Sequence, residues 1–516
     1  MSLLSAFGAA APARLPKETG PKETGKEYDR PEREAVPMGL MAPLFLLVLA
    51  LGLFLTGLLP YGFMAKAVSQ FRQGGTPIEA SWSALLAVLS FLVLLRWCVV
   101  QTLSFVSHWK LSRRQGGQLE SGPQRGQPES GPQAGRPESW PLVSILVPAF
   151  QESDTIASAL RSLIELDYPL YEIIVVDDGS PDDTYEKASA FIGDHGRCRM
   201  RLFRKPNGGK WSALNLAFGQ ASGELILCID ADSRLSRDAL KRLVAHMDDP
   251  GVAGVSGQIT VRNRRNILTR LQAYEYIVAN GGLRSAQSLL GAVLVVPGPI
   301  GLYRRAALQG VSAATGGAAT GGAATGGIDH PLRPGEVPGP FSHETFAEDF
   351  QLSLTILAAG GRIVYEPRAL SYTKSPDLTH TLLNQRYRWF RGTMQVLRIY
   401  RQRLRHLPRS NRRRLNLLIA ALYPLDLYVL PPVNFIVLSG LIISAASSQA
   451  HASLLLWVGA AWLLNLASGT RHILTQQDDL SLLFMVPLYE LYHGLLLNSA
   501  WAIAMFDEVR QSKMDW

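Results

Sequence analysis

The chain has 516 residues, of which 47% are hydrophobic and 18% charged, and its formal net charge is +9 at pH 7. Such an excess of hydrophobic residues is typical of a protein with membrane-embedded segments. The three cysteines, Cys98, Cys198 and Cys228, offer neither a disulfide framework nor a paired metal-ligand spacing, which excludes the small disulfide-stabilised secreted proteins and favours a reducing compartment.

Two apolar segments follow a polar N-terminal tail. Residues 1–37 contain the tandem repeat PKETGPKETG and are predicted to be disordered. Residues 39–60 and 82–100 are each long enough to cross a bilayer core of roughly 30 Å as a helix. The first is longer than the apolar core of a secretory signal, which has roughly 7–15 residues. We therefore expect two transmembrane helices within 38–103.

Low-complexity sequence comes next and also interrupts the domain that follows. Residues 104–139 form a linker in which ESGPQ occurs twice, and AATGGAATGGAATGG occupies 313–327 within a domain predicted at 140–380. Neither segment can bury a core, so both are predicted to be disordered. We interpret 313–327 as a flexible insertion with no chemistry of its own.

The domain at 140–380 alternates strand-like and helix-like patterns, which favours a mostly parallel sheet covered by helices. In such sheets ligands bind beyond the carboxyl ends of the strands, and this is where the acidic residues lie. The expected strands are VSILVPAF, EIIVVDD, RMRLFRK and ELILCIDAD, and the polar stretches after the first, second and fourth are PAFQE (148–152), DDGS (177–180) and DADS (230–233).

Asp230 and Asp232 are one residue apart at a predicted strand end. Asp-rich turns are common without any ligand, but two carboxylates so placed suit a hard divalent cation, Mg²⁺ or Mn²⁺, that also holds substrate phosphates. Lys210 follows two glycines at a predicted helix start and is either a solvated lysine or a point charge for an anionic ligand. The Walker spacing is absent, which disfavours an ATPase.

Two further signals lie nearer the C-terminus. Glu348 and Asp349 open a helical stretch, where they either compensate the helix dipole or supply a general base. The stretch LLNQRYRWFRGTMQ starts a predicted interfacial segment at 381–414, whose end, from Arg398 to Arg414, has eight Arg and no acidic residue. Because this run abuts apolar sequence, a cytosolic membrane flank is favoured over nucleic-acid binding.

The segment 415–508 is predicted to contain about three more transmembrane helices, which makes about five in all, with four to six possible. Polar residues within it either line a path for a hydrated glycan or lie at the membrane interface. These residues are Asp426, Glu490, His493 and Asn498.

The ordered motifs PAFQE, DDGS, NGGK, DAD, GPIGLYRR, AED, YEPRAL and QRYRW together resemble those of the processive family 2 glycosyltransferases, which include cellulose, hyaluronan and chitin synthases. The order of the last three is most similar to that of bacterial poly-β-1,6-N-acetylglucosamine synthases. The resemblance covers about 140–400 and the apolar segments on either side. Two departures are Ala347, where relatives have Thr, and the insertion at 313–327.

The resemblance implies an α/β domain of GT-A type (Rossmann-like), cytosolic and inserted between α-helical transmembrane segments. It implies that Asp177 and Asp178 hold uracil or ribose, that Lys210 contacts the donor, and that Asp349, beside Glu348, is the catalytic base. Asp230 and Asp232 would bring Mg²⁺ or Mn²⁺ to the diphosphate. The remaining implied site residues are Pro148, Glu152, Gln385, Arg386 and Arg388 for the donor, and Gly298, Pro299 and Trp389 for the acceptor.

Three hypotheses follow. The first is a multi-pass enzyme of the inner or plasma membrane that polymerises a β-linked polysaccharide, of N-acetylglucosamine, from a UDP-sugar and passes it across the bilayer. The second is a non-processive enzyme that adds one sugar to a lipid. The third is a basic membrane-anchored binding protein with an inactive catalytic fold. Accessory membrane subunits are possible partners in the first, and nucleic acid is not expected as a partner in any.

Overall fold

The computed structural model describes residues 38–74, 77–119, 140–314, 338–403, 419, 425–435 and 452–512. The predictions for the N-terminal tail, for most of the insertion at 313–327 and for most of the segment 404–446 therefore fall outside the described residues.

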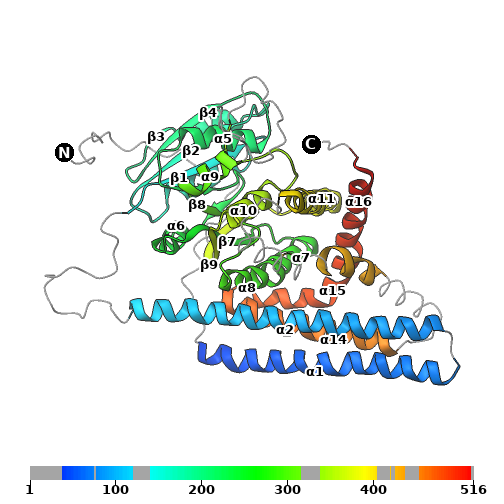
Figure 1. Cartoon of the computed structure of the whole chain (residues 1–516). Helices are drawn as coiled ribbons and strands as arrows, with labels where there is room; N and C mark the ends of the chain where they lie inside the picture. The colour runs from blue at the N-terminus through cyan, green and yellow to red at the C-terminus, as the bar shows by residue number, and fades with distance from the viewer. Residues whose placement is uncertain are drawn as a thin grey trace, which may run out of the picture.

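Two long apolar helices, α1 (Met38–Arg72) and α2 (Pro77–Leu119), lie side by side with α14 (Ala452–Gln476) (Figure 1). Leu59 of α1, Leu94 of α2 and Leu464 of α14 belong to one buried cluster. Other apolar side chains of α1 and α2 face outward, among them Leu47, which is 69% exposed. Such outward apolar faces are typical of helices in lipid.

Three helical stretches among the described residues are long and apolar enough to cross a membrane: Met41–Arg72, Ala87–Arg113 and Leu480–Arg510. The last consists of η7 (Leu480–Met485), α15 (Val486–Leu491), η8 (Tyr492–Leu497) and α16 (Asn498–Arg510). The chain is thus a membrane protein by the length and composition of its helices. The number of spans remains a prediction.

The prediction that the linker 104–139 is disordered is wrong for its first part, because α2 remains helical to Leu119. Ser104 and His108 are buried, and His108 is within hydrogen-bonding distance of Ser285 in α8 (Gly282–Leu289), at 3.2 Å between Nε2 and Oγ. Packing against α8 and α14 therefore extends the helix beyond its apolar run.

The soluble part contains a nine-stranded sheet with the order β3-β4-β2-β1-β5-β8-β7-β9-β6. Its first half uses the four predicted strands, which all run parallel. Their bounds are β1 (Val143–Ala149), β2 (Tyr171–Asp177), β4 (Cys198–Arg204) and β5 (Leu225–Cys228), and the two-residue β3 (Gly193–Asp194) pairs antiparallel with β4.

The second half of the sheet is mixed, which corrects the expectation of a mostly parallel sheet. β8 (Gly301–Arg304) runs antiparallel to both β5 and β7 (Val252–Val261), whereas β9 (Arg362–Thr373) is parallel to β7. β6 (Arg234–Leu235) pairs antiparallel with β9. Gly301, the first residue of β8, pairs with Cys228, the last residue of β5, so β8 enters the sheet at the end at which β5 leaves it.

Helices cover both faces of the sheet. Along β1, Ile145 belongs to one buried cluster and Leu146 to another, because successive side chains of a strand point to opposite faces. The covering helices are α3 (Ile156–Ile164), α4 (Thr184–Ser189), α5 (Lys210–Gln220), α6 (Ala239–Val244), η3 (Ala245–Asp248), α9 (Arg305–Ala314) and α10 (Glu348–Ala358).

Helices α7 (Ile267–Glu275) and η4 (Tyr276–Gly281), with α8, lie between the sheet and the apolar helices (Figure 1). A side-chain carbon added at Gly282 would lie 2.8 Å from Nε2 of His472 in α14, so a larger residue there would push the two layers apart.

Helix α11 (Thr379–Arg403) packs on α16, and Arg398 forms an ion pair with Glu508 at 2.7 Å. Close packing and charge thus join the two parts of the chain.

Candidate active site

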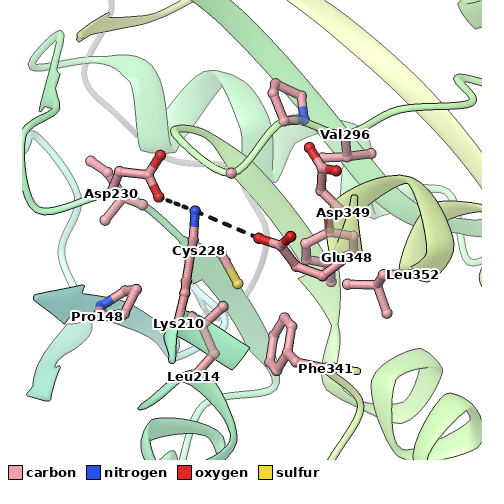
Figure 2. Close-up of a pocket in the computed structure, with 14 residues that line it drawn as sticks. Pro148, Lys210, Leu214, Cys228, Asp230, Val296, Phe341, Glu348, Asp349 and Leu352 are labelled. Carbon is pink, nitrogen blue, oxygen red and sulfur yellow. Dashed lines mark hydrogen bonds and ion pairs between the residues drawn. The ribbon is translucent and has the colours of Figure 1, made fainter. Parts of the chain in front are cut away.

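One pocket lies at the carboxyl ends of β1 and β5, beside the start of α5 and α10. Figure 2 shows acidic side chains on opposite sides of Lys210 in this pocket. The structure thus brings together six of the predicted site residues. They are Pro148, Lys210, Asp230, Gly298, Glu348 and Asp349.

Asp178 organises the glycine-rich loop that leads to Lys210. Its carboxylate accepts hydrogen bonds from the backbone N–H groups of Gly208 (3.1 Å) and Gly209 (2.8 Å) and pairs with Lys205 (2.6 Å). Gly209 has φ of 90°, a conformation that side chains disfavour. Asp178 therefore fixes the backbone just before α5 begins at Lys210.

Asp177 is also buried, at 1% exposure, and its carboxylate lies 3.1 Å from Nε of Arg204. Neither oxygen of this carboxylate has a hydrogen-bond partner within the described residues, whereas the carboxylate of Asp178 is hydrogen-bonded by the protein. Their contact with a nucleotide remains a prediction.

Lys210 bridges the two acidic sides of the pocket. Its ammonium lies 2.5 Å from Asp230 and 3.9 Å from Glu348. Desolvation disfavours the charged ammonium, but Asp230 and Glu348 outweigh it and raise the pKa of Lys210 above its ordinary value. A side-chain carbon at Gly298 would lie 2.6 Å from Nζ, so a larger residue there would displace the ammonium of Lys210 from its present position.

The carboxylates on the β5 side are close enough to disfavour each other's charge. Desolvation and then Asp230 raise the pKa of Asp232, whose carboxylate accepts hydrogen bonds from Ser233 (2.8 Å) and Thr373 (3.4 Å). Desolvation, with smaller effects of Asp232 and Asp230, raises the pKa of Glu152 to about 7. A cation bound here would relieve this repulsion.

The donor atoms on this side are hard oxygens, which fit Mg²⁺ or Mn²⁺. No group of three or more His, Cys, Asp or Glu side chains within the described residues is arranged to hold a metal ion. Asp230 and Asp232 would therefore supply two ligands, and the substrate phosphates and water the others, as is usual for Mg²⁺.

Asp349 lies in the first turn of α10, where its Oδ1 accepts a hydrogen bond from the backbone of Phe350 at 2.7 Å. Desolvation and the neighbouring Glu348 raise its pKa to about 7, although Lys210 acts in the opposite direction. Ala347 supplies no side-chain cap to the helix, and its N–H donates to Thr345 at 3.3 Å instead. A carboxyl group with such a pKa is suited to accept a proton near neutral pH.

Comparison with known proteins agrees with this geometry. Residues 144–311 match the family model described as Glycosyl transferase family 2. The chain contains a family 2 glycosyltransferase domain. This match, with the mixed sheet, confirms the predicted α/β fold of GT-A type.

Two curated relatives of the family 2 domain are bacterial. One is a poly-beta-1,6-N-acetyl-D-glucosamine synthase of Staphylococcus epidermidis, 31% identical over 256 residues, which are 49% of this chain and 55% of that protein. The other is an N-acetylglucosaminyltransferase of Rhizobium meliloti, 35% identical over 259 residues, which are 49% of this chain and 56% of that protein. The chain thus spans about half the length of the curated relatives it matches.

Two solved structures are also similar. A mannosyltransferase of Pyrobaculum calidifontis in complex with GDP-Man and Mn²⁺ has a TM-score of 0.48 and 21% identity, and the match covers 81% of this chain and 100% of that one. Staphylococcus aureus TarS 1-349 with UDP-GlcNAc has a TM-score of 0.39 and 17% identity, with 73% and 93% covered.

Sequence reasoning missed Asn215, which connects the two sides of the pocket in the family 2 domain. Asn215 is buried in α5; its amide donates to the carbonyl of Phe341 at 3.0 Å and accepts from the N–H of Phe341 at 3.1 Å. This pair of bonds fixes the chain that returns to the pocket ahead of α10. The signal available in the sequence was an amide side chain within the mainly apolar stretch that follows Lys210.

The QRYRW residues of α11 lie outside the wall of this pocket. Arg386 is only 2% exposed and pairs with Glu275 at 2.7 Å, so its side chain is directed into the protein rather than toward a donor. Arg388 and Trp389 are exposed, whereas Oε1 of Gln385 is buried. Arg386 is therefore paired within the protein and does not line the pocket.

Two other predicted residues have protein contacts of their own. Pro299 adjoins the pocket residue Gly298, and its carbonyl accepts a hydrogen bond from Ser371 at 2.9 Å. The backbone N–H of Glu152 donates to Thr184 at 2.8 Å, and its carboxylate accepts from Thr155 at 2.5 Å. These contacts fix two loops beside the pocket, the one that follows β1 and the one that precedes β8.

Proposed function

We propose that the chain is an inverting membrane glycosyltransferase that polymerises a β-linked polysaccharide of N-acetylglucosamine from a UDP-sugar. The observation that carries this proposal is the pocket in which Lys210 lies between Asp230 and Glu348, with Asp349 beside them. It combines a cation for a diphosphate with a carboxyl group whose pKa is about 7. The family 2 match over 144–311 supports the reaction class.

The donor would bind at the β5 side. Lys210 offers its ammonium to the diphosphate, and the loop fixed by Asp178 holds it at the start of α5. A divalent cation at Asp230 and Asp232 would neutralise negative charge on the departing diphosphate. Donor contacts by Pro148, Glu152 and Arg388 are part of the proposal on the strength of the motif resemblance.

Transfer would take place in one displacement. The acceptor hydroxyl oxygen attacks the anomeric carbon, and the bond from that carbon to the diphosphate oxygen breaks with its electrons remaining on UDP. Asp349 accepts the hydroxyl proton. Lys210 stabilises the charge that develops on the leaving group.

The acceptor and the direction of export rest on the membrane-facing elements. Trp389 is 42% exposed and offers an amphipathic aromatic face to a sugar. The basic run from Arg398 to Arg414 favours a cytosolic catalytic domain. The names of the two curated relatives support N-acetylglucosamine as the sugar, although this chain covers only 55% and 56% of their lengths.

The test uses the full chain in vesicles with UDP-N-acetylglucosamine, UDP-glucose or UDP-glucuronate, and Mg²⁺, Mn²⁺ or a chelator. We expect metal-dependent UDP release, fastest with UDP-N-acetylglucosamine, and a product many sugars long. A single sugar on lipid would replace this proposal with the non-processive alternative. No UDP release from any donor would leave only the inactive binding protein.

A further inference from the structure

Arg386 is a fully buried cation on the inner face of α11. One of its terminal nitrogens, Nη2, donates to Oε2 of Glu275 at 2.7 Å. The other two nitrogens, Nε and Nη1, have no hydrogen-bond acceptor within the part of the chain that the structure describes. A buried ion pair recovers its desolvation cost only when its geometry is good and its other polar atoms are hydrogen-bonded. Two nitrogens of Arg386 lack such a partner among the described residues, so this pair is expected to have a function other than stabilising the fold.

Trp389 lies against this guanidinium. The central carbon of Arg386 is 4.1 Å from the centre of the Trp389 ring and 5.7 Å from that of Tyr276. The rings of Tyr276 and Trp389 are themselves 6.4 Å apart and nearly parallel, at 27°. One face of the indole is therefore held by a cation and an aromatic ring, while the side chain keeps 42% of its surface exposed.

The same carboxylate also connects to the last apolar stretch. Tyr492, in η8, donates its hydroxyl to Oε2 of Glu275 at 2.7 Å. Glu275 ends α7 and immediately precedes the π-helix η4, which begins at Tyr276. Oε2 of Glu275 thus accepts hydrogen bonds from Arg386 in α11 and from Tyr492 in the apolar stretch Leu480–Arg510. The next residue after Glu275 is Tyr276, whose ring contacts Trp389.

We propose that Glu275 and Tyr492 are positioning residues that set the orientation of the Trp389 indole through Arg386, and so fix where the acceptor sugar lies relative to the pocket. This inference rests on the proposed function, in which Trp389 contacts the acceptor. Donor binding, at the β5 side of the pocket, does not pass through these residues.

The test compares Glu275→Gln and Tyr492→Phe with the unmodified full chain in vesicles, with UDP-N-acetylglucosamine as donor and an N-acetylglucosamine oligosaccharide as acceptor. Both variants should raise the acceptor KM, by roughly 10-fold for Glu275→Gln, as for the loss of about 1.4 kcal/mol of binding, and less for Tyr492→Phe. The product should become shorter. The donor KM should change less than about 2-fold, since the donor pocket is untouched.

A double-mutant cycle separates positioning from general stability. In a Trp389→Ala background, Glu275→Gln should cause little further rise in acceptor KM, because its effect passes through the missing indole. The matched control is Asp478→Asn, which disturbs another ion pair between the domain and the apolar part, Asp478 with Arg264 at 2.6 Å. That variant should lower thermal stability without changing the ratio of acceptor KM to donor KM.

The outcomes are distinct. An unmodified chain that releases no UDP would overturn the proposed function itself. An active chain whose Tyr492→Phe and Glu275→Gln variants keep the normal acceptor KM and product length would overturn this inference alone. The inference would also be wrong if Glu275→Gln raised donor and acceptor KM equally. Should Glu275→Gln fail to fold, Tyr492→Phe, which removes only a hydroxyl, provides the same readout.

Discussion

Asp230 and Asp349 are aspartates of one pocket, yet their surroundings differ. Asp230 contacts the ammonium of Lys210 at 2.5 Å, whereas Asp349 accepts a backbone hydrogen bond from Phe350 and has the acidic Glu348 as its neighbour. The first environment places a carboxylate directly beside a cation, and the second raises the pKa of Asp349 to about 7. The same side chain is thereby suited to metal binding on one side of the pocket and to proton transfer on the other.

The largest expected effect follows from Asp349→Asn. The amide cannot accept the acceptor's proton, so UDP release should fall by ~10²–10⁴-fold, the usual contribution of a general base. Folding provides an independent check. Because the pKa of Asp349 is raised on folding, its ionisation destabilises the protein as pH rises through about 7. The variant should therefore be at least as heat-stable as the unmodified chain at pH 8. Near-normal UDP release by the variant would show that Asp349 is not the general base.

Asp232→Asn should show the opposite pattern. It removes a charged oxygen from the metal side, so the Mn²⁺ concentration for half-maximal UDP release should rise by about 10-fold or more. Turnover at saturating Mn²⁺ should recover in part. Asp349→Asn is the matched control, since its residual activity should keep the original Mn²⁺ dependence. An unchanged Mn²⁺ titration for Asp232→Asn would refute its assignment as a ligand.

The pH dependence of UDP release tests whether Lys210, which contacts Asp230, also lowers the pKa of Asp349 on the other side of the pocket. Activity should rise with pH through about 7 as Asp349 loses its proton. Lys210 holds the pKa of Asp349 down, so Lys210→Met should shift this rise to higher pH as well as slow the reaction. Lys205→Met, which removes the partner of Asp178 instead, should slow the reaction without moving the rise. Identical profiles for the two variants would show that Lys210 does not act on Asp349.

A smaller effect should come from Gly339→Ala. An added side-chain carbon would overlap the Asn215 amide that fixes the chain ahead of α10, so stability should fall by about 1–3 kcal/mol, as in an overpacked core. In an Asn215→Ala background the same change should cost little, because the overlap is gone. Thermal unfolding of the four proteins in this cycle measures the difference. Equal costs in both backgrounds would exclude Asn215 as the cause.

The parallel half of the sheet and the β5 side of the pocket could be predicted from sequence. Strands β1, β2, β4 and β5 are successive βαβ units, so their carboxyl ends meet at one edge and bring Lys210 close to Asp230. The four-residue strand β8 carries too short a pattern to indicate that it runs antiparallel between β5 and β7.

Side-chain orientation was harder to predict. Among the arginines of QRYRW, Arg386 is buried and Arg388 exposed, and what decides this is Glu275, which is far away in the sequence. Similarly, the DDGS motif does not indicate that the carboxylate of Asp178 accepts hydrogen bonds from the amides of Gly208 and Gly209. Both contacts depend on tertiary packing that no local motif contains.

The most direct test of the two-sided pocket is calorimetry of UDP binding with Mn²⁺ on the Asp349→Asn and Asp232→Asn variants of the full chain in detergent. UDP contacts the metal side but contains no acceptor hydroxyl. The account predicts that Asp349→Asn binds UDP with Mn²⁺ almost as tightly as the unmodified chain, while Asp232→Asn binds it about 10-fold more weakly or worse. Equal loss of UDP affinity in the two variants would contradict the division of roles between Asp232 and Asp349.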